Sequence, residues 1–120
     1  MKLLAAIAVV IVALLHAGFM ALEMFFWDHE IGRRIFSMTP EQSAATSVLA
    51  ANQGLYNGFL AAGLVWGLAA GKRDVQMFFL LCVVVAGLVG GYTAKPTIYV
   101  TQALPGALAL LLVAFAPARR

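Results

Sequence analysis

Apolar residues fill four long stretches of the chain, and charged residues lie almost entirely between them. The stretches cover residues 3–22, interrupted only by His16, and residues 42–71, 75–94 and 96–118. A helix needs about 20 predominantly apolar residues to cross a bilayer, and each stretch reaches that length. The pattern predicts an all-α fold, an integral membrane four-helix bundle that forms a single domain over residues 1–120. The expected spans are at about 3–27, 40–70, 75–92 and 97–116.

The second predicted span has recognisable start and stop signals. Thr39, Pro40 and Gln42 supply a hydroxyl cap, a proline at the first helical position and an amide three residues after the cap, which is typical of a helix start. Gly71, followed by Lys72, suits a left-handed terminating residue next to a cation at the helix carboxyl end. The resulting helix of about 31 residues would be about 46 Å long, so it must tilt or project from the membrane.

Composition agrees with a membrane location, and the positions of the basic residues explain the positive net charge. Hydrophobic residues make up 63% of the sequence and charged residues 11%, the reverse of the balance in disordered or freely soluble chains. The net charge of +3 does not indicate nucleic acid as a partner, because most basic residues lie at span ends and are typical of topology signals.

The basic residues favour an orientation with both termini in the cytoplasm. The inner side would then carry Lys2, Lys72, Arg73, Arg119 and Arg120, and the outer side Arg33, Arg34 and Lys95. Five basic residues against three is a small bias. It leaves dual insertion open, with antiparallel pairing of identical chains.

The single cysteine limits the chemistry available within one chain. Cys82 lies in the third apolar stretch and can form neither an intramolecular disulfide nor a dithiol redox centre. A site built from several thiolates is excluded for the same reason, and one histidine with a neighbouring methionine cannot hold both faces of a haem. We expect no metal site and assign no catalytic residue, and the cofactor is left unknown.

Two ionisable side chains lie inside the first predicted span. At about 100° per residue, His16, Met20, Glu23 and Trp27 share an arc of about 60° on one helix face. His16 and Glu23 are separated by about 10 Å along the axis, so they cannot bond to each other. Each therefore needs a partner from another helix or from water, because polar groups in hydrocarbon must be satisfied inside the protein.

The second predicted span separates small residues from polar ones. Its small stripes are Gly54, Gly58 and Ala62, and Gly63, Gly67 and Gly71. Small residues at this spacing let helices approach closely, so we expect neighbours on more than one side.

Four polar residues lie on an arc roughly opposite the first small stripe. They are Asn52, Gln53, Tyr56 and Asn57. Counting depth from the outer ends of the spans predicts that Glu23 contacts Asn52 and Gln53. The same count places His16 against Tyr56 and Asn57.

The fourth predicted span adds polar groups in the outer half of the membrane. Pro105 lacks an amide hydrogen and so frees the carbonyl of Thr101, beside the amide of Gln102. We therefore expect a polar pocket in the outer leaflet. Its candidate ligand-binding or proton-coupling residues are His16, Glu23, Asn52, Gln53, Tyr56, Asn57, Thr101 and Gln102.

The ionisable groups also have purely structural explanations. Glu23 is near enough to the predicted membrane boundary to pair with Arg33 or Arg34. His16 could be a neutral imidazole satisfied by polar groups of the second span. Residues 28–30, Asp-His-Glu, are more typical of a solvated turn than of a ligand cluster, because consecutive residues on a helix point in different directions.

Several segments resemble a known family. The strings are HAGFMALEMFFW at residues 16–27, GRRIF at 32–36, VLAANQGLYNGFLAAGLVWG at 48–67 and QALPGALALLL at 102–112. They are similar to the domain-of-unknown-function 1304 family of small bacterial four-helix membrane proteins, over nearly the whole chain. The resemblance implies four helices in a bacterial membrane and supplies no catalytic residues.

The expected function is that of a small polytopic protein of the bacterial cytoplasmic (inner) membrane whose pocket binds a small or amphipathic ligand. A histidine and a carboxylate in a polar membrane cavity favour proton-coupled transport. Two other classes stay open: a structural or accessory membrane subunit without its own activity, and a membrane enzyme or binder of a lipid-soluble cofactor such as quinone. The expected partners are the lipid bilayer, a small-molecule or lipid-like ligand and a second copy of the chain in a homodimer.

Overall fold

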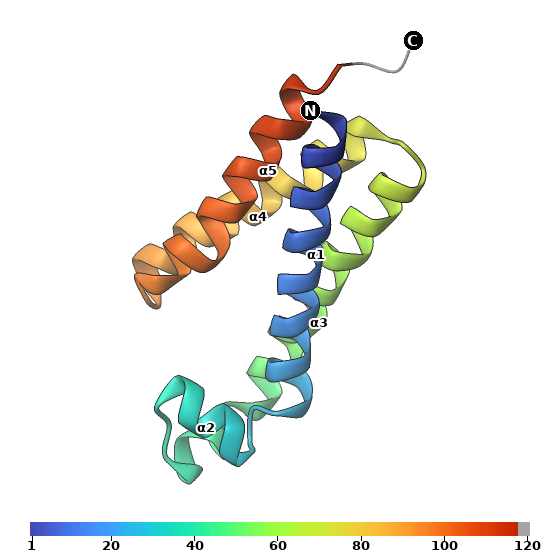
Figure 1. Cartoon of the computed structure of the whole chain (residues 1–120). Coiled ribbons are helices and arrows are strands. Elements are labelled where there is room, and N and C mark those ends of the chain that lie inside the picture. The colour runs from blue at the N-terminus through green and yellow to red at the C-terminus, as the bar shows by residue number, and fades with distance from the viewer. Residues whose placement is uncertain (118–120) are drawn as a thin grey trace. The chain divides into compact units, whose positions relative to one another are not determined.

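The computed structural model describes residues 1–117, and within that range the chain forms helices and no strand (Figure 1). The helices are α1 (Lys2–Phe25), α2 (Glu30–Phe36), α3 (Pro40–Ala69), α4 (Arg73–Thr93), the π-helical segment η1 (Tyr99–Ala103) and α5 (Leu104–Phe115). The predicted all-α class is confirmed. The described residues form five α-helices rather than four, because α2 occupies the predicted connection between the first two spans. Arg119 and Arg120, which count toward the charge bias, lie outside the described residues.

The chain divides into two compact units. The first combines Met1–Leu14 with the chain from Leu60 onward, and the second is Leu15–Phe59. Helices α1 and α3 each contribute to both units, because the divisions fall within them.

Both ends of α3 follow from the local sequence. At its start, the Gln42 amide N–H donates to Thr39 Oγ1 at 3.1 Å, and the Thr39 N–H donates to Gln42 Oε1 at 2.9 Å, so the predicted reciprocal cap is confirmed. At its end, Gly71 has φ 63° and the N–H of Lys72 donates to the carbonyl of Gly67 at 2.8 Å. This left-handed residue ends the helix as predicted, because glycine adopts positive φ without a Cβ clash.

In the first unit, small residues bring the helices close together. A Cβ added at Gly87 of α4 would lie 2.6 Å from the backbone nitrogen of Ala103 in η1. At the α3–α4 turn, a Cβ at Gly67 would lie 3.0 Å from the backbone nitrogen of Gln76, and the Gln76 Nε2 donates to the Gly67 carbonyl at 3.1 Å. The core of this unit also contains Leu64, Leu80, Val83, Ala109 and Val113. The second small stripe of α3 therefore packs against α4, as the spacing predicted.

The segment before Pro105 is π-helical rather than α-helical. The N–H of Leu104 donates to the carbonyl of Tyr99, five residues earlier, and the missing N–H of Pro105 gives a physical reason for a break in the regular ladder here. Helix α4 continues to Thr93, one residue beyond the predicted span, and Gly91 packs against the ring of Tyr99.

Two of the described helices are long and apolar enough to cross a membrane. They are α1 and α4, and only 28% and 22% of their apolar windows are buried within the chain. The segment Tyr99–Phe115 is apolar but shorter. Helix α3 is long, but its middle carries the amides of Asn52, Gln53 and Asn57.

Candidate functional site

In the second unit, α1 and α3 lie side by side (Figure 1), and glycines of α3 face α1. A Cβ built at Gly54 would lie 3.0 Å from Glu23 Cβ and 3.2 Å from the carbonyl oxygen of Met20, and one built at Gly58 would lie 2.6 Å from the sulfur of Met20. Each of these distances is tighter than ordinary van der Waals contact. The two glycines therefore allow a closer approach of α3 to α1 than any other residue type would.

This close approach joins two of the predicted site residues in a contact that the sequence did not predict. The Asn57 Nδ2 donates to Glu23 Oε1 at 2.7 Å. Glu23 is only 9% exposed, and Asn57 is half-buried. A side chain as short as that of asparagine can span the interface because Gly54 and Gly58 flank it and add no bulk of their own.

The register of the two helices differs from the predicted one. Glu23 bonds to Asn57, whereas depth counting placed it against Asn52 and Gln53, one helical turn nearer the start of α3. Asn52 and Gln53 are both exposed. The count was wrong because it took the spans to end together at the membrane boundary, and it had no knowledge of the contacts between α2 and the end of α1.

The His16 side chain is enclosed by the protein, and its predicted contacts with Tyr56 and Asn57 stay a prediction. The His16 side chain is 1% exposed, and its ring packs edge-on against Phe19 with centroids 5.3 Å apart. Tyr56, its predicted partner, is 64% exposed and packs against Phe59, while Asn57 bonds to Glu23.

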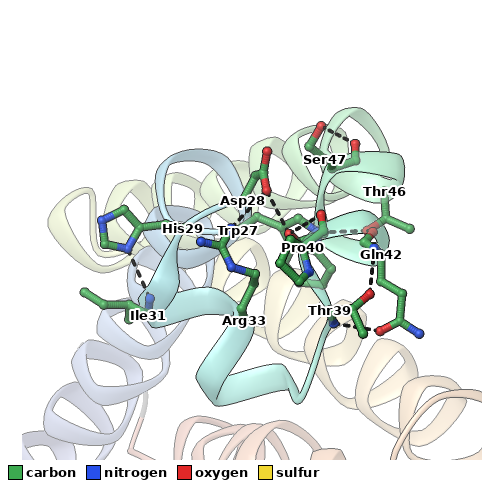
Figure 2. A network of polar contacts seen from close by, with 12 residues as sticks. Trp27, Asp28, His29, Ile31, Arg33, Thr39, Pro40, Gln42, Thr46 and Ser47 are labelled. Carbon is green, nitrogen blue, oxygen red and sulfur yellow. Dashed lines mark hydrogen bonds and ion pairs between the residues drawn. The ribbon is translucent and has the colours of Figure 1, made fainter.

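A polar network ties the end of α1 to the start of α3 (Figure 2). The Trp27 Nε1 donates to Thr46 Oγ1 at 2.9 Å. The Ser43 hydroxyl donates to Asp28 Oδ1 at 2.7 Å, and Arg33 Nη1 approaches the same oxygen at 3.2 Å. Sequence reasoning did not find this network; the only available signal was the placement of hydroxyls three residues apart on one side of a predicted helix.

Both arginines of α2 are engaged near this network rather than with Glu23. Arg33 pairs with Asp28, and Arg34 Nη2 pairs with Glu30 Oε1 at 3.0 Å, across one turn of helix. The structural explanation that paired Glu23 with either arginine is therefore wrong. The hydrogen-bond partner of the Glu23 carboxyl among residues 1–117 is a neutral amide.

The segment 28–30 is more structured than the solvated turn predicted for it. Trp27 and Asp28 form the turn, and Glu30 begins α2. The His29 Nδ1 accepts from the N–H of Ile31 at 3.1 Å, so His29 caps the helix. The cap is not one of the usual residue types, which explains why the sequence did not predict a helix start.

Helix α2 is packed against the chain that precedes it. A Cβ at Gly32 would lie 2.6 Å from the carbonyl oxygen of Trp27 and closer still to that of Phe26. The rings of Trp27 and Phe36 pack with centroids 4.8 Å apart. Gly32 thus allows direct contact between α2 and the backbone after α1.

Thr101 and Gln102 belong to the first unit, in η1. The Thr101 hydroxyl donates to the carbonyl of Thr97, four residues earlier, at 3.2 Å, and Thr101 is exposed. Gln102 is half-buried. Their role in ligand binding stays a prediction. In the part of the chain that the structure describes, no three His, Cys, Asp or Glu side chains come together as metal ligands.

Residues 10–114 match the family described as Protein of unknown function (DUF1304). The chain belongs to this family. The matched range contains the Glu23–Asn57 pair, both glycines beside it and the whole of α2. The resemblance seen in the sequence is therefore confirmed.

A bacterial relative supports the same conclusion. The chain is 31% identical over 115 residues to the uncharacterized protein YpaA of Lactococcus lactis subsp. lactis (strain IL1403). The matched region covers 92% of this chain and 94% of the relative. No solved structure gives a significant match to the chain.

Proposed function

We propose that this DUF1304 protein is a multi-pass protein of the bacterial inner membrane, and that the Glu23–Asn57 pair is its proton-binding and ligand-recognising site. The second unit would act by changing the contact between α1 and α3 when the Glu23 carboxyl gains or loses a proton. The function is a proton-coupled exchange or uptake of a small or amphipathic ligand.

The exposure of the apolar helices supports the membrane location. A core helix of a soluble protein is mostly buried, whereas α1 and α4 bury only about a quarter of their apolar windows. Leu3, Leu14 and Phe25 of α1 are each more than 65% exposed. An exposed apolar surface along a whole helix is stable in lipid and unfavourable in water. The proposal takes α3 and the segment η1–α5 as the remaining two spans, with both termini in the cytoplasm.

The observation that carries the proposed site is the burial of Glu23 beside a neutral partner. Carboxylates inside membrane helices are rare and mark proton or substrate pathways when they occur. Asn57 can donate to the Glu23 oxygen whether or not the carboxyl holds a proton, so the pair can exist in two charge states. In a low-dielectric site, gaining or losing one charge changes local interaction energies by several kcal/mol.

Flux measurements on reconstituted protein test this function. Small molecules that co-purify with the protein are first identified by mass spectrometry and then added to proteoliposomes that contain a pH-sensitive dye and carry an imposed proton gradient. Ligand-dependent proton movement is expected for the unsubstituted protein and for Glu30→Gln, because Glu30 is a 78% exposed carboxylate of α2. Glu23→Gln is expected to abolish it, since an amide cannot exchange the proton.

A second candidate is a structural or accessory membrane subunit. The observation that favours it is the fastening of α1 to α3 by the bonds of Trp27 to Thr46 and of Asp28 to Ser43, which need no ligand. On this account, the unsubstituted protein shows no ligand-dependent proton movement, and Glu23→Gln changes only its stability. Absence of proton movement in the unsubstituted protein would therefore favour the accessory role, whereas unchanged proton movement in Glu23→Gln would exclude the proposed site.

A further inference from the structure

The side of α3 that faces away from α1 carries a regular seam. Its positions recur with spacings of four and three residues, the heptad pattern of helices that pack along their length. The seam positions are Ala45, Leu49, Asn52, Tyr56 and Phe59. All five are exposed, with Leu49 at 69% and Phe59 at 54%.

The seam cannot be covered by α1. At about 100° per residue, Asn52 lies about 160° around α3 from Gly54, the residue that packs against Glu23 and Met24. The same spacing continues along α3 to Gly63, four residues after Phe59, and there a helix does pack on it, because a Cβ at Gly63 would clash with the ring of Phe79 in α4.

We infer that this seam is a dimer interface, in which α3 of one chain packs in parallel against α3 of a second copy. A parallel two-fold axis places each seam residue opposite its own counterpart. The Asn52 amide and the Tyr56 hydroxyl each have both a hydrogen-bond donor and an acceptor. Each group can therefore form a hydrogen bond with the same group of the second copy. Leu49 and Phe59 add apolar contact on either side of them.

The membrane location in the proposed function makes the second copy the favoured occupant. Polar side chains that face lipid are unfavourable and are almost always satisfied within protein. An asparagine at a heptad position is a known means of fixing helix pairing and register. A charged partner would need charge complementarity, and none of the five seam residues is charged.

Cysteine cross-linking in membranes tests the interface. In a Cys82→Ala background, which removes the single native cysteine, Leu49→Cys is expected to give a disulfide-linked dimer after oxidation with copper phenanthroline. Val48→Cys is the matched control, because Val48 is 76% exposed at nearly the same depth but is rotated by about 100° around the helix. Equal cross-linking at the two positions, or none at Leu49→Cys, would overturn the inference.

The polar contribution is tested separately by mass measurement in detergent. The unsubstituted protein is expected to be a dimer, and Asn52→Leu is expected to raise the dissociation constant about fivefold, since interhelical hydrogen bonds contribute about 1 kcal/mol in membranes. Val48→Leu should leave the dimer unchanged. A monomeric unsubstituted protein, or an Asn52→Leu dimer of the same affinity, refutes the inference. Because neither experiment touches Glu23, their failure is distinguishable from failure of the proposed proton site.

Discussion

Replacing Gly54 by alanine tests whether the glycines of α3 set the distance between the two helices. The added Cβ would lie 2.7 Å from Met24 Cγ and 3.0 Å from Glu23 Cβ, whereas ordinary contact begins at 3.4 Å. Met24 Cγ can move by rotation of its side chain, but the Cβ of Glu23 is fixed to the backbone, so the helices must separate by about 0.4 Å. The Asn57–Glu23 bond would lengthen from 2.7 Å to about 3.1 Å, which is still within hydrogen-bonding range. We therefore expect the bond to weaken without breaking.

Gly18→Ala provides the matched control for this substitution. Gly18 lies in the middle of α1, and a Cβ added there meets nothing within 4 Å. Both substitutions gain the same intrinsic helix propensity, about 1 kcal/mol, so the difference in their free energies of unfolding isolates the packing cost. Overpacking costs about 1–3 kcal/mol, and we expect Gly54→Ala to be less stable than Gly18→Ala by that amount.

The assay is thermal unfolding of both variants in the same detergent, monitored by the fluorescence of the two tryptophans. A difference of 1–3 kcal/mol corresponds to a lower midpoint for Gly54→Ala by at least about 3 °C. If Gly54→Ala is as stable as Gly18→Ala, the close approach of α1 and α3 is not what makes glycine necessary at this position, and the account of the Glu23–Asn57 contact fails.

Two further substitutions probe the second unit. Asn57→Ala removes the donor to the buried Glu23 carboxyl and should destabilise the protein by about 1–3 kcal/mol in the same unfolding assay. The control is Thr93→Ala, which removes an exposed hydroxyl bonded within its own helix and should cost less than about 0.5 kcal/mol. Equal effects of the two substitutions would contradict the role of the Glu23–Asn57 pair. Gly32→Ala places a methyl group against backbone carbonyl oxygens that cannot move aside, so α2 should detach and trypsin should cleave after Arg33 much faster than in the unsubstituted protein. Unchanged cleavage would show that α2 tolerates a side chain there.

Local features of this chain could be predicted from sequence because their causes are local. The reciprocal cap of Thr39 and Gln42 and the positive φ of Gly71 depend on residues within one or two turns. The small stripes of α3 also correctly indicated neighbours on two sides, because small residues at spacing four allow close helix packing whichever helix the partner is.

The partner of each polar residue could not be predicted in the same way. Depth counting chose Asn52 and Gln53 for Glu23, but a register error of one turn is enough to replace them with Asn57. That register depends on how α2, with Gly32 against the backbone at Trp27, joins α1 to α3. Helix α2 itself was missed because a segment of seven residues is too short to show a periodic pattern.

The sequence alone determined that the chain is all-α, that its helices carry unusually apolar surfaces, and that His16 and Glu23 interrupt one of them. These properties follow from composition and from the positions of polar residues along one helix, so they need no knowledge of what lies opposite. Only the tertiary structure decided that Glu23 meets Asn57 and that Asn52 and Tyr56 are exposed. The physical reason is that hydrogen-bond partners are chosen by the register and rotation of two packed helices, and these depend on glycine contacts and connecting segments far apart in the sequence.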